Sequence, residues 1–352
     1  MSVATRALCA VALVSVVVAS GCSGSSDASE PAASATSSDS LLPEAEGVTE
    51  YPLTVTSEVG EIVVEQRPER VVMGSSWDAD LFAALDVVPV ATDEQIEFYP
   101  WAVDALPAAI EAIWPMGDAA YPAEQIADTN PDLIVDTQAT DAEEVRQVSD
   151  IAPVLGAPEG TADTLSWRDR ILLLGEVLDL SNRAQQVIDD YDATFEDIRA
   201  EHPEFAGKTV DLLVLWGGGS GTGFLNTAGS DQELLMSNLG FAPNSNAGNE
   251  ALAEGLPDEL IDSLTGDVLV VSNQAEQSEF DAFYGNPLVQ RLPSVQNGRD
   301  VVLDWDVDTL AVTHDGQPQD FTGHFGRAFG IGPLAHVELA ELLVPLLSEK
   351  LR

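Results

Sequence analysis

Short apolar runs alternate with helical patterns through the first half of the chain. The pattern predicts a hairpin over residues 53–64, around Val59-Gly60. Three apolar runs of strand length follow at residues 70–73, 87–91 and 132–135, with a helical pattern over residues 79–85 after the first of them. Strands that alternate with helices predict a parallel sheet with helices on both faces.

A long amphipathic helix separates this half from a second one. Its apolar face recurs at spacings of three and four residues, at Ala184, Val187, Ile188, Tyr191, Phe195 and Ile198. The pattern ends at His202-Pro203, and strand-length runs restart at residues 210–215, 268–271 and 301–303.

This order of elements predicts an α/β protein of two doubly wound lobes joined by a single long α-helix. We place the N-terminal lobe at residues 51–180, the connecting helix at 181–205 and the C-terminal lobe at 206–352. The ligand cleft is expected between the lobes, where the carboxyl ends of strands face each other.

The N-terminus has the pattern of an export signal. Arg6 is the only charge before Asp27, and residues 7–19 form an apolar run too short to span a bilayer. Small residues then lead to Cys22, which resembles a bacterial lipoprotein signal with Ala19 where leucine is more usual. We expect residues 1–21 to be a cleaved signal peptide and Cys22 to be acylated, for example with palmitate. The alternative is an ordinary signal peptide with an incidental cysteine.

Residues 22–50 are rich in serine, alanine and acids, with almost no large apolar residue before Leu41. Such a segment cannot bury enough surface to fold, and it is typical of a flexible tether. We therefore expect a monomeric body held by a lipid on the extracytoplasmic face of the cell membrane.

The charge of the chain narrows its possible partners. Its 14 Lys and Arg against 60 Asp and Glu give a net charge of −46. Nucleic-acid affinity depends on cations that displace counterions from phosphates, so nucleic-acid binding is excluded. Adhesion to anionic lipid through basic patches is excluded for the same reason.

An internal repeat links the two halves. Glu124 and Asp132 in the first half match Glu259 and Asp267 in the second. Each glutamate lies on a short predicted helix, with the aspartate eight residues later and then a buried strand. The alternative is chance similarity between two generic units. If the repeat is real, each lobe carries one carboxylate at an equivalent place, which suits a dimeric partner with two equivalent surfaces.

Several short motifs follow one another from residue 51 to about residue 345. They are Pro68–Met73 with Asp80–Leu85, Glu124 with Asn130–Ile134, Ile151–Val154, Leu234–Phe241, and Pro287–Leu292 with Pro293–Arg299. Together they resemble the periplasmic-type substrate-binding proteins of ABC importers whose two lobes are joined by one long helix. That family binds ferric siderophores, haem or cobalamin, and the resemblance implies no cofactor, with Fe(III) carried by the siderophore as cargo.

The resemblance also implies docking residues. In related proteins, glutamates at the positions of Glu124 and Glu259 enter arginine-bearing pockets of a permease dimer. The chain departs from the family at residues 252–255, where relatives often carry Ser-x-Glu. This leaves Glu254 as a competing docking residue.

Aromatic residues are the candidate ligand contacts. Trp77, Trp216 and Trp305 lie just past predicted strands, where aromatic faces suit a large, partly apolar ligand. The alternative is that each fills core space. Further candidates are Tyr99, Trp101, Tyr121, Gln138 and Arg327, the last for an anionic group unless it is a plain surface arginine.

Other chemistries find little support in the sequence. The glycine-rich residues 216–223 lack both the P-loop and the dinucleotide-binding spacing. Ser220 has Thr222 where a hydrolase elbow requires glycine, and the four histidines show no metal-ligating spacing. We therefore expect no enzyme activity and no bound metal of the protein's own.

Two classes of function remain. The first is a binding lipoprotein that feeds an ABC importer with a ferric siderophore, with cobalamin or haem as alternative cargoes. The second is a lipid-anchored sensor or hydrolase on the same fold. Asp304, Asp306 and Asp308 bracket Trp305, and charges of one sign in a cleft resist cargo of the same sign. We therefore favour a hydroxamate-type siderophore over a strongly anionic tris-catecholate.

The position of Cys22 generates a prediction about anchoring. Cys22→Ala removes the sulfur that would carry the lipid, so the protein is expected in the soluble fraction or unprocessed. Membrane fractionation and mass spectrometry of the N-terminal peptide measure this, with Cys9→Ala as the control. Retention of the Cys22→Ala protein in the membrane fraction at the wild-type level would refute the assignment.

Overall fold

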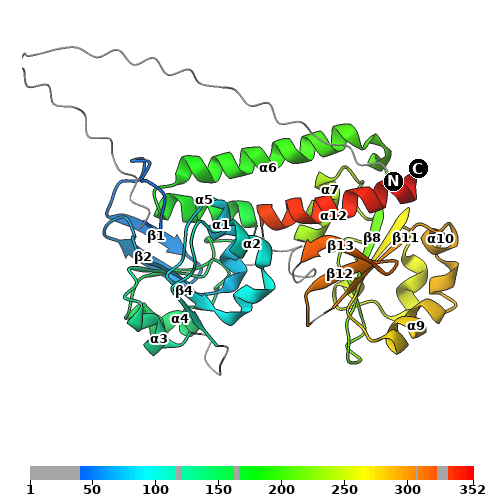
Figure 1. Cartoon of the computed structure of the whole chain (residues 1–352), viewed down its shortest axis with the longest axis horizontal. Coiled ribbons are helices and arrows are strands. Elements are labelled where there is room, and N and C mark those ends of the chain that lie inside the picture. Colours follow the sequence, from blue (N-terminus) through cyan, green and yellow to red (C-terminus); the bar gives the residue numbers. More distant parts are fainter. Residues whose placement is uncertain (1–39, 116, 118–120, 162–165, 307, 323–331) are drawn as a thin grey trace, which may run out of the picture. The chain divides into compact units, whose positions relative to one another are not determined.

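Three sheets form the framework of the residues that the structure describes (Figure 1). The computed structural model describes residues 40–352 apart from 116, 118–120, 162–165, 307 and 323–331. An antiparallel hairpin of β1 (Leu53–Ser57) and β2 (Gly60–Val64) comes first, as predicted. The hairpin contacts the segment after β7 (Val154–Leu155) through a bridge between Ser57 and Pro158 and a hydrogen bond from the N–H of Glu58 to the carbonyl of Ala157.

The N-terminal lobe is built on a parallel sheet with the strand order β5-β4-β3-β6-β7. Its strands are β3 (Val71–Met73), β4 (Ala91–Asp93), β5 (Ala112–Trp114), β6 (Leu133–Val135) and β7 (Val154–Leu155). Its helices are the 3₁₀ helices η1 (Ser76–Asp78) and η2 (Glu94–Phe98), and α1 (Ala79–Ala84), α2 (Pro100–Ala105), α3 (Ala123–Asp128) and α4 (Ala142–Ser149).

The C-terminal lobe is built on a mixed sheet with the order β13-β12-β11-β10-β8-β9. Its strands are β8 (Val210–Leu215), β9 (Thr222–Phe224), β10 (Val268–Asn273), β11 (Asp300–Trp305), β12 (Ala311–His314) and β13 (Gln317–Thr322). The central strands β8, β10 and β11 are parallel, and antiparallel strands flank them. Its helices are α7 (Asp231–Asn238), α8 (Glu250–Ala253), η4 (Asp258–Ser263), α9 (Gln277–Gly285), η5 (Val289–Arg291) and α10 (Pro293–Gln296).

Two helices, α5 (Trp167–Val177) and α6 (Ser181–Glu201), carry the chain from the first sheet to the second, followed by η3 (Pro203–Phe205). The predicted α/β architecture of two lobes is therefore confirmed. One strand was misplaced, because the apolar run 87–91 passes through the core before β4 begins at Ala91. Pro89, which lacks an N–H to donate, lies in the middle of that run.

The segment before the first hairpin packs against the start of α6. Glu46 accepts hydrogen bonds from the backbone N–H groups of Asn182 and Arg183. Asp179 accepts from the N–H groups of residues 47–49, and Leu42 is 5% exposed. The expected tether ran to residue 50, but its described C-terminal part belongs to the folded body. Leu42 supplies apolar burial and these carboxylates supply hydrogen bonds, and the composition of residues 40–50 does not reveal either.

A second helix connects the lobes. The N-terminal end of α12 (Pro333–Leu351) packs against α1 and α2, and its length packs against α6 and against strands of the C-terminal sheet. Figure 1 shows α6 and α12 side by side along the described body.

The start of α12 is capped by a residue from the other lobe. Asp80 of α1 is fully buried and accepts hydrogen bonds from the N–H groups of Leu334 (3.0 Å) and Ala335 (2.7 Å). The indole Nε1 of Trp101 donates to the same carboxylate at 3.1 Å. A Cβ at Gly332 would lie 2.4 Å from Asp80 Oδ1, so only glycine lets the chain pass this close. A negative group at a helix N-terminus accepts hydrogen bonds from the free N–H groups and interacts favourably with the positive end of the helix dipole.

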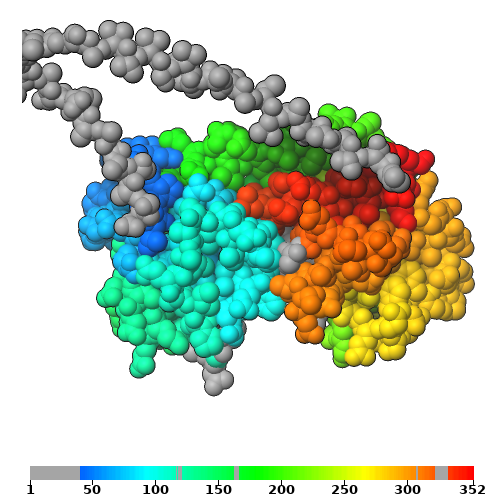
Figure 2. All heavy atoms as spheres, in the orientation of Figure 1, coloured from blue at the N-terminus to red at the C-terminus, as the bar shows by residue number. Residues whose placement is uncertain are grey.

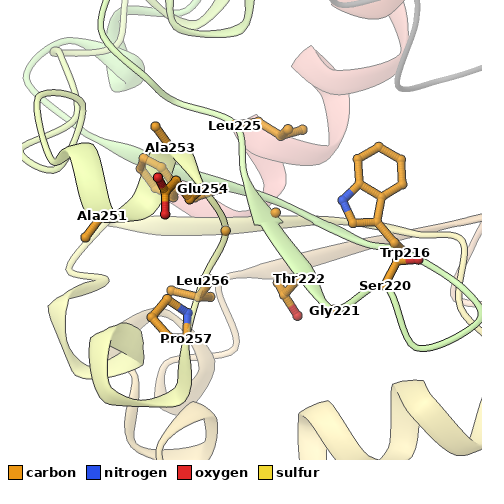
Figure 3. Close-up of a pocket in the computed structure, with 13 residues that line it drawn as sticks. Trp216, Ser220, Gly221, Thr222, Leu225, Ala251, Ala253, Glu254, Leu256 and Pro257 are labelled. Atoms are coloured by element: carbon orange, nitrogen blue, oxygen red, sulfur yellow. The ribbon is translucent and has the colours of Figure 1, made fainter.

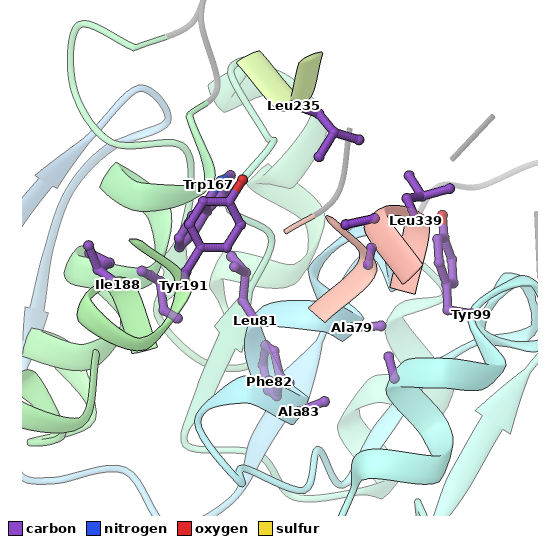
Figure 4. Close-up of a cluster of buried hydrophobic side chains, with 14 of the residues drawn as sticks. Ala79, Leu81, Phe82, Ala83, Tyr99, Trp167, Ile188, Tyr191, Leu235 and Leu339 are labelled. Carbon is purple, nitrogen blue, oxygen red and sulfur yellow. The ribbon is translucent and has the colours of Figure 1, made fainter. Parts of the chain in front are cut away.

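The apolar core is continuous across both lobes. Figure 4 shows Leu81 and Phe82 of α1 in the same cluster as Trp167, Tyr191, Leu235 and Leu339, which belong to α5, α6, α7 and α12. Since the cluster also contains residues of both sheets, the lobes share one core.

Asp80 gives a prediction about stability. A carboxyl group has two oxygens that can accept, whether ionised or protonated, whereas an amide has one. Asp80→Asn therefore leaves a helix N–H without its partner and is expected to cost about 1–3 kcal/mol. Burial raises the pKa of Asp80 to about 6, although the N–H groups of Ala335 and Leu334 favour its charged form. A folded-state pKa above the unfolded value means that the stabilisation associated with the proton is lost as pH rises through 6.

The destabilisation caused by Asp80→Asn is therefore expected to be largest near pH 4 and to shrink towards pH 7. Equilibrium denaturant unfolding across this pH range measures it. Asp104→Asn, an exposed aspartate on α2, is the matched control. A penalty that grows as pH rises would contradict the assignment.

Candidate functional site

Buried carboxylates line the carboxyl edge of the N-terminal sheet. Asp78 is 0% exposed, and it accepts hydrogen bonds from the N–H and the hydroxyl of Thr137, which follows β6. Arg170 of α5, itself 1% exposed, faces Asp78 with 3.4 Å between Nη1 and Oδ1. Burial raises the pKa of the Asp78 carboxyl, while Arg170 and Thr137 lower it.

A second buried carboxylate lies beside the first. Asp136 accepts a hydrogen bond of 2.6 Å from the hydroxyl of Tyr121. Burial, followed by the charge of Asp78, raises the pKa of Asp136 to about 6, and burial also raises the pKa of Tyr121. Gly74 runs close to Tyr121, since a Cβ there would lie 3.2 Å from the ring. Tyr121, which is 3% exposed, therefore presents little surface to a ligand and mainly orders the end of β6.

An aromatic row leads from this edge towards the C-terminal lobe. The ring centroids of Trp77 and Tyr99 are 6.4 Å apart, those of Tyr99 and Trp101 are 5.7 Å apart, and those of Trp101 and Phe321 are 6.0 Å apart. Phe321 belongs to β13, whereas the other three rings belong to the N-terminal lobe, so the row crosses from one lobe to the other. Figure 2 shows the cyan segment that contains α2 bordering the orange segment that contains β12 and β13.

The predicted ligand contacts in this row differ in exposure. Trp77 and Trp101 are partly exposed, whereas Tyr99 has no exposed surface. Tyr99 was expected to contact ligand, but in this structure it is a core residue held between the two tryptophans. Its position in a proline-punctuated loop could not show that it would join the core shared by both lobes.

In the C-terminal lobe the two tryptophans differ. Trp216 follows β8 directly and is 38% exposed. Trp305 is the last residue of β11 rather than the one after it, and it is 8% exposed. Asp304 beside it accepts a hydrogen bond from Asn273 Nδ2 at the end of β10. Trp216 is therefore the more accessible aromatic face of this lobe.

A cavity of about 560 Å³ lies along the edge strand β9. Figure 3 shows Trp216 on one side of β9 and Glu254 on the other. The remaining lining residues are Ser220, Gly221, Thr222, Gly223, Phe224, Leu225, Ala251, Ala253, Gly255, Leu256 and Pro257. No Lys or Arg is among the described residues that line it.

The remaining candidates are dispersed. Gln138 is partly exposed just after β6, where its N–H donates to Asp136. Arg327 lies outside the described residues. The residues that sequence reasoning missed are Asp78, Asp80 and Phe321. The closely spaced acids Asp78 and Asp80 in an otherwise apolar stretch were the available signal, but their partners come from distant parts of the chain.

The cations of the sheets lie at the opposite edges. Arg70 precedes β3 and pairs with Glu111, and Lys208 precedes β8 and pairs with Asp267 at 2.9 Å. Arg299 directly precedes β11. Arg70 and Lys208, at the amino ends of these parallel strands, are thus paired with acids, whereas the carboxyl ends carry aromatic rings and, in the N-terminal lobe, the buried acids Asp78 and Asp136.

The internal repeat corresponds to equivalent structure. Asp132 accepts a hydrogen bond from the N–H of Arg70, just before β3, and Asp267 accepts one from the N–H of Thr209, just before β8. In each lobe the aspartate therefore precedes one strand and caps the start of the strand paired with it. Glu124 lies exposed on α3 and Glu259 lies exposed on η4, each ahead of the repeated strand.

Among the described residues, none of the helices combines the length and the apolar composition that a membrane span requires. No group of three or more His, Cys, Asp or Glu side chains is arranged there to hold a metal ion.

Comparison with known proteins identifies the family. The family model described as "periplasmic binding protein" matches residues 71–307. The chain belongs to this family. It is 26% identical over 280 residues to the ferric enterobactin-binding periplasmic protein of Escherichia coli, covering 70% of this chain and 82% of that protein. It is 25% identical over 179 residues to the probable siderophore-binding lipoprotein of Bacillus subtilis, covering 51% of this chain and 53% of that protein.

Solved structures agree on the fold. A periplasmic solute binding protein from Mycobacterium smegmatis superposes with a TM-score of 0.67 at 23% identity, covering 85% of this chain and 99% of that one. The iron-uptake substrate-binding protein PiaA of Streptococcus pneumoniae superposes in its ferrichrome complex with a TM-score of 0.64 at 18% identity, covering 85% of this chain and 98% of that one. At these identities the similarity shows the fold.

Proposed function

We propose that this protein captures a ferric siderophore and delivers it to an ABC importer for iron uptake. The observation that carries the proposal is the pair of carboxyl edges, one in each lobe, with the partly exposed Trp77 and Trp101 in one lobe and the exposed Trp216 in the other. Rigid aromatic faces give a bulky, partly apolar ligand a large contact area at little entropic cost. The family and the names of the two curated relatives support this choice of cargo.

The proposed location follows from the N-terminus. A signal peptide over residues 1–21 and a lipid on Cys22 would place the body on the extracytoplasmic face of the membrane. The name of the Bacillus subtilis relative, a lipoprotein, supports this arrangement. Residues 23–39 would then be the length of chain between the lipid and the first described residue, Ser40.

The proposed docking surface uses Glu124 and Glu259. Both side chains are exposed, and the equivalent roles of Asp132 and Asp267 support equivalent positions in the two lobes. A monomer with one carboxylate per lobe can meet both halves of a permease dimer.

The proposed cargo is of the hydroxamate type. A tris-catecholate iron complex carries several negative charges, whereas a tris-hydroxamate complex is neutral. Arg170 is already paired with Asp78, and Arg70 and Lys208 lie at the far ends of their strands. A binding site whose described residues include acids and few unpaired cations disfavours an anionic ligand.

The docking proposal predicts a separation of uptake from binding. The double change Glu124→Ala and Glu259→Ala is expected to abolish uptake of radioactive iron complex in cells that carry the permease. Ligand affinity should stay within about threefold, which is under 1 kcal/mol. The matched control is Glu97→Ala with Glu250→Ala, one exposed glutamate per lobe. Normal uptake by the first pair, or a collapse of its affinity, would show that the repeat has another role.

The cargo proposal predicts an order of affinities. Titration by tryptophan fluorescence with ferric tris-hydroxamates, ferric tris-catecholates, haem and cobalamin should give the tightest binding for a tris-hydroxamate. The preference over catecholates should shrink as salt rises, because salt screens exposed charges. Tighter binding of a catecholate would overturn the charge argument, and tighter binding of haem or cobalamin would overturn the siderophore assignment.

A further inference from the structure

The cavity beside β9 has one apolar wall that depends on a glycine. The indole of Trp216 lies over β9, where a Cβ at Gly223 would come 3.1 Å from Trp216 Nε1 and 2.8 Å from Val214 Cγ1. Any larger residue at 223 would displace the ring. Leu225, the residue directly after β9, continues the apolar lining. This wall is therefore an aromatic and aliphatic surface on the rigid edge of the sheet.

The opposite wall carries the only charge among the described lining residues, Glu254. Its side chain is exposed and has no hydrogen bond or ion pair within the described chain. The backbone that follows is attached to the strand, since the N–H of Leu256 donates to the carbonyl of Thr222 at 2.7 Å. Gly255 makes the turn with a φ of +136°. The carboxylate is thus held at the rim of the cavity without a partner of its own.

These two walls fit one kind of ligand group. A chain of methylene groups would pack on Trp216 and Leu225, and an ammonium at its end would pair with Glu254. The cavity volume of about 560 Å³ lies in the usual range for small-molecule sites. A ligand group that carries a carboxylate would be repelled by Glu254, and no Lys or Arg among the described lining residues would offset that repulsion.

We propose that this cavity receives a flexible alkylammonium arm of the cargo, with Glu254 as its counter-ion and Trp216 as its apolar support. The inference rests on the proposed function, since the arm belongs to the ferric siderophore. It assigns Glu254 to ligand selection rather than to permease docking. It also narrows the cargo to iron complexes that carry a free amine.

The test compares two forms of one ligand. The probes are a ferric tris-hydroxamate with a free terminal amine and the same complex with that amine acetylated. The wild-type protein should bind the free amine about three- to fivefold more tightly, the range of an exposed ion pair. In Glu254→Gln this ratio should fall to about one. Glu250→Gln, an exposed glutamate on α8 outside the lining, should keep the wild-type ratio.

A second variant tests the apolar wall. Gly223→Ala should weaken both forms of the ligand by displacing the indole, while the ratio between them is retained. Equal binding of the two forms by the wild-type protein would overturn the inference and leave the proposed function standing. Loss of uptake in Glu254→Gln with an unchanged ratio would assign Glu254 to docking and also overturn it. If neither form binds at all, the proposed function itself fails.

Discussion

The hydrogen bonds between Asp80 and the start of α12 are the interaction on which the rest of the structure depends. A buried carboxylate is tolerated only when donors satisfy it, and here two N–H groups of α12 and the indole of Trp101 do so. The carboxylate belongs to the N-terminal lobe, and α12 packs on the C-terminal sheet. The lobes are therefore joined by a charge-assisted cap as well as by the continuous core around α6 and α12. Separating the lobes would leave the Asp80 carboxyl without its N–H donors from α12, so the structure favours small movements between the lobes.

The distribution of charge follows from the direction of the strands. Asp132 and Asp267 precede strands and cap the starts of their neighbours, so these acids lie with Arg70 and Lys208 at the amino ends. At the other ends of the strands lie the acids that receive buried hydrogen bonds, such as Asp78 and Asp136. Among the described residues, the surface at these ends is aromatic and has few cations that are not already paired. This arrangement is the physical basis of the proposal that the cargo is neutral or cationic.

The sequence was sufficient to predict the order of helices and strands, because the spacing of apolar residues and the length of apolar runs can be read directly from it. The apolar face of α6 and the buried strands β8 and β10 were predicted within a few residues. The strand predicted at residues 87–91 was wrong, because a buried connection and a buried strand have the same apolar pattern in a single sequence. The repeat around Glu124 and Glu259 was visible for a different reason, since each lobe uses the same hydrogen bond to start a strand.

The sequence by itself determined the two-lobed α/β architecture, the acidity and the repeated carboxylates, because periodicity and composition are local properties of the chain. Only the tertiary structure decided which aromatic residues face solvent. Tyr99 is buried in a core cluster beside Leu339 of α12 (Figure 4), more than 200 residues away, whereas Trp216 stays exposed beside the edge strand β9. Likewise, the partner of Asp80 lies 254 residues further along the chain. Burial and pairing depend on contacts between distant segments, and a pattern of neighbouring residues carries no record of them.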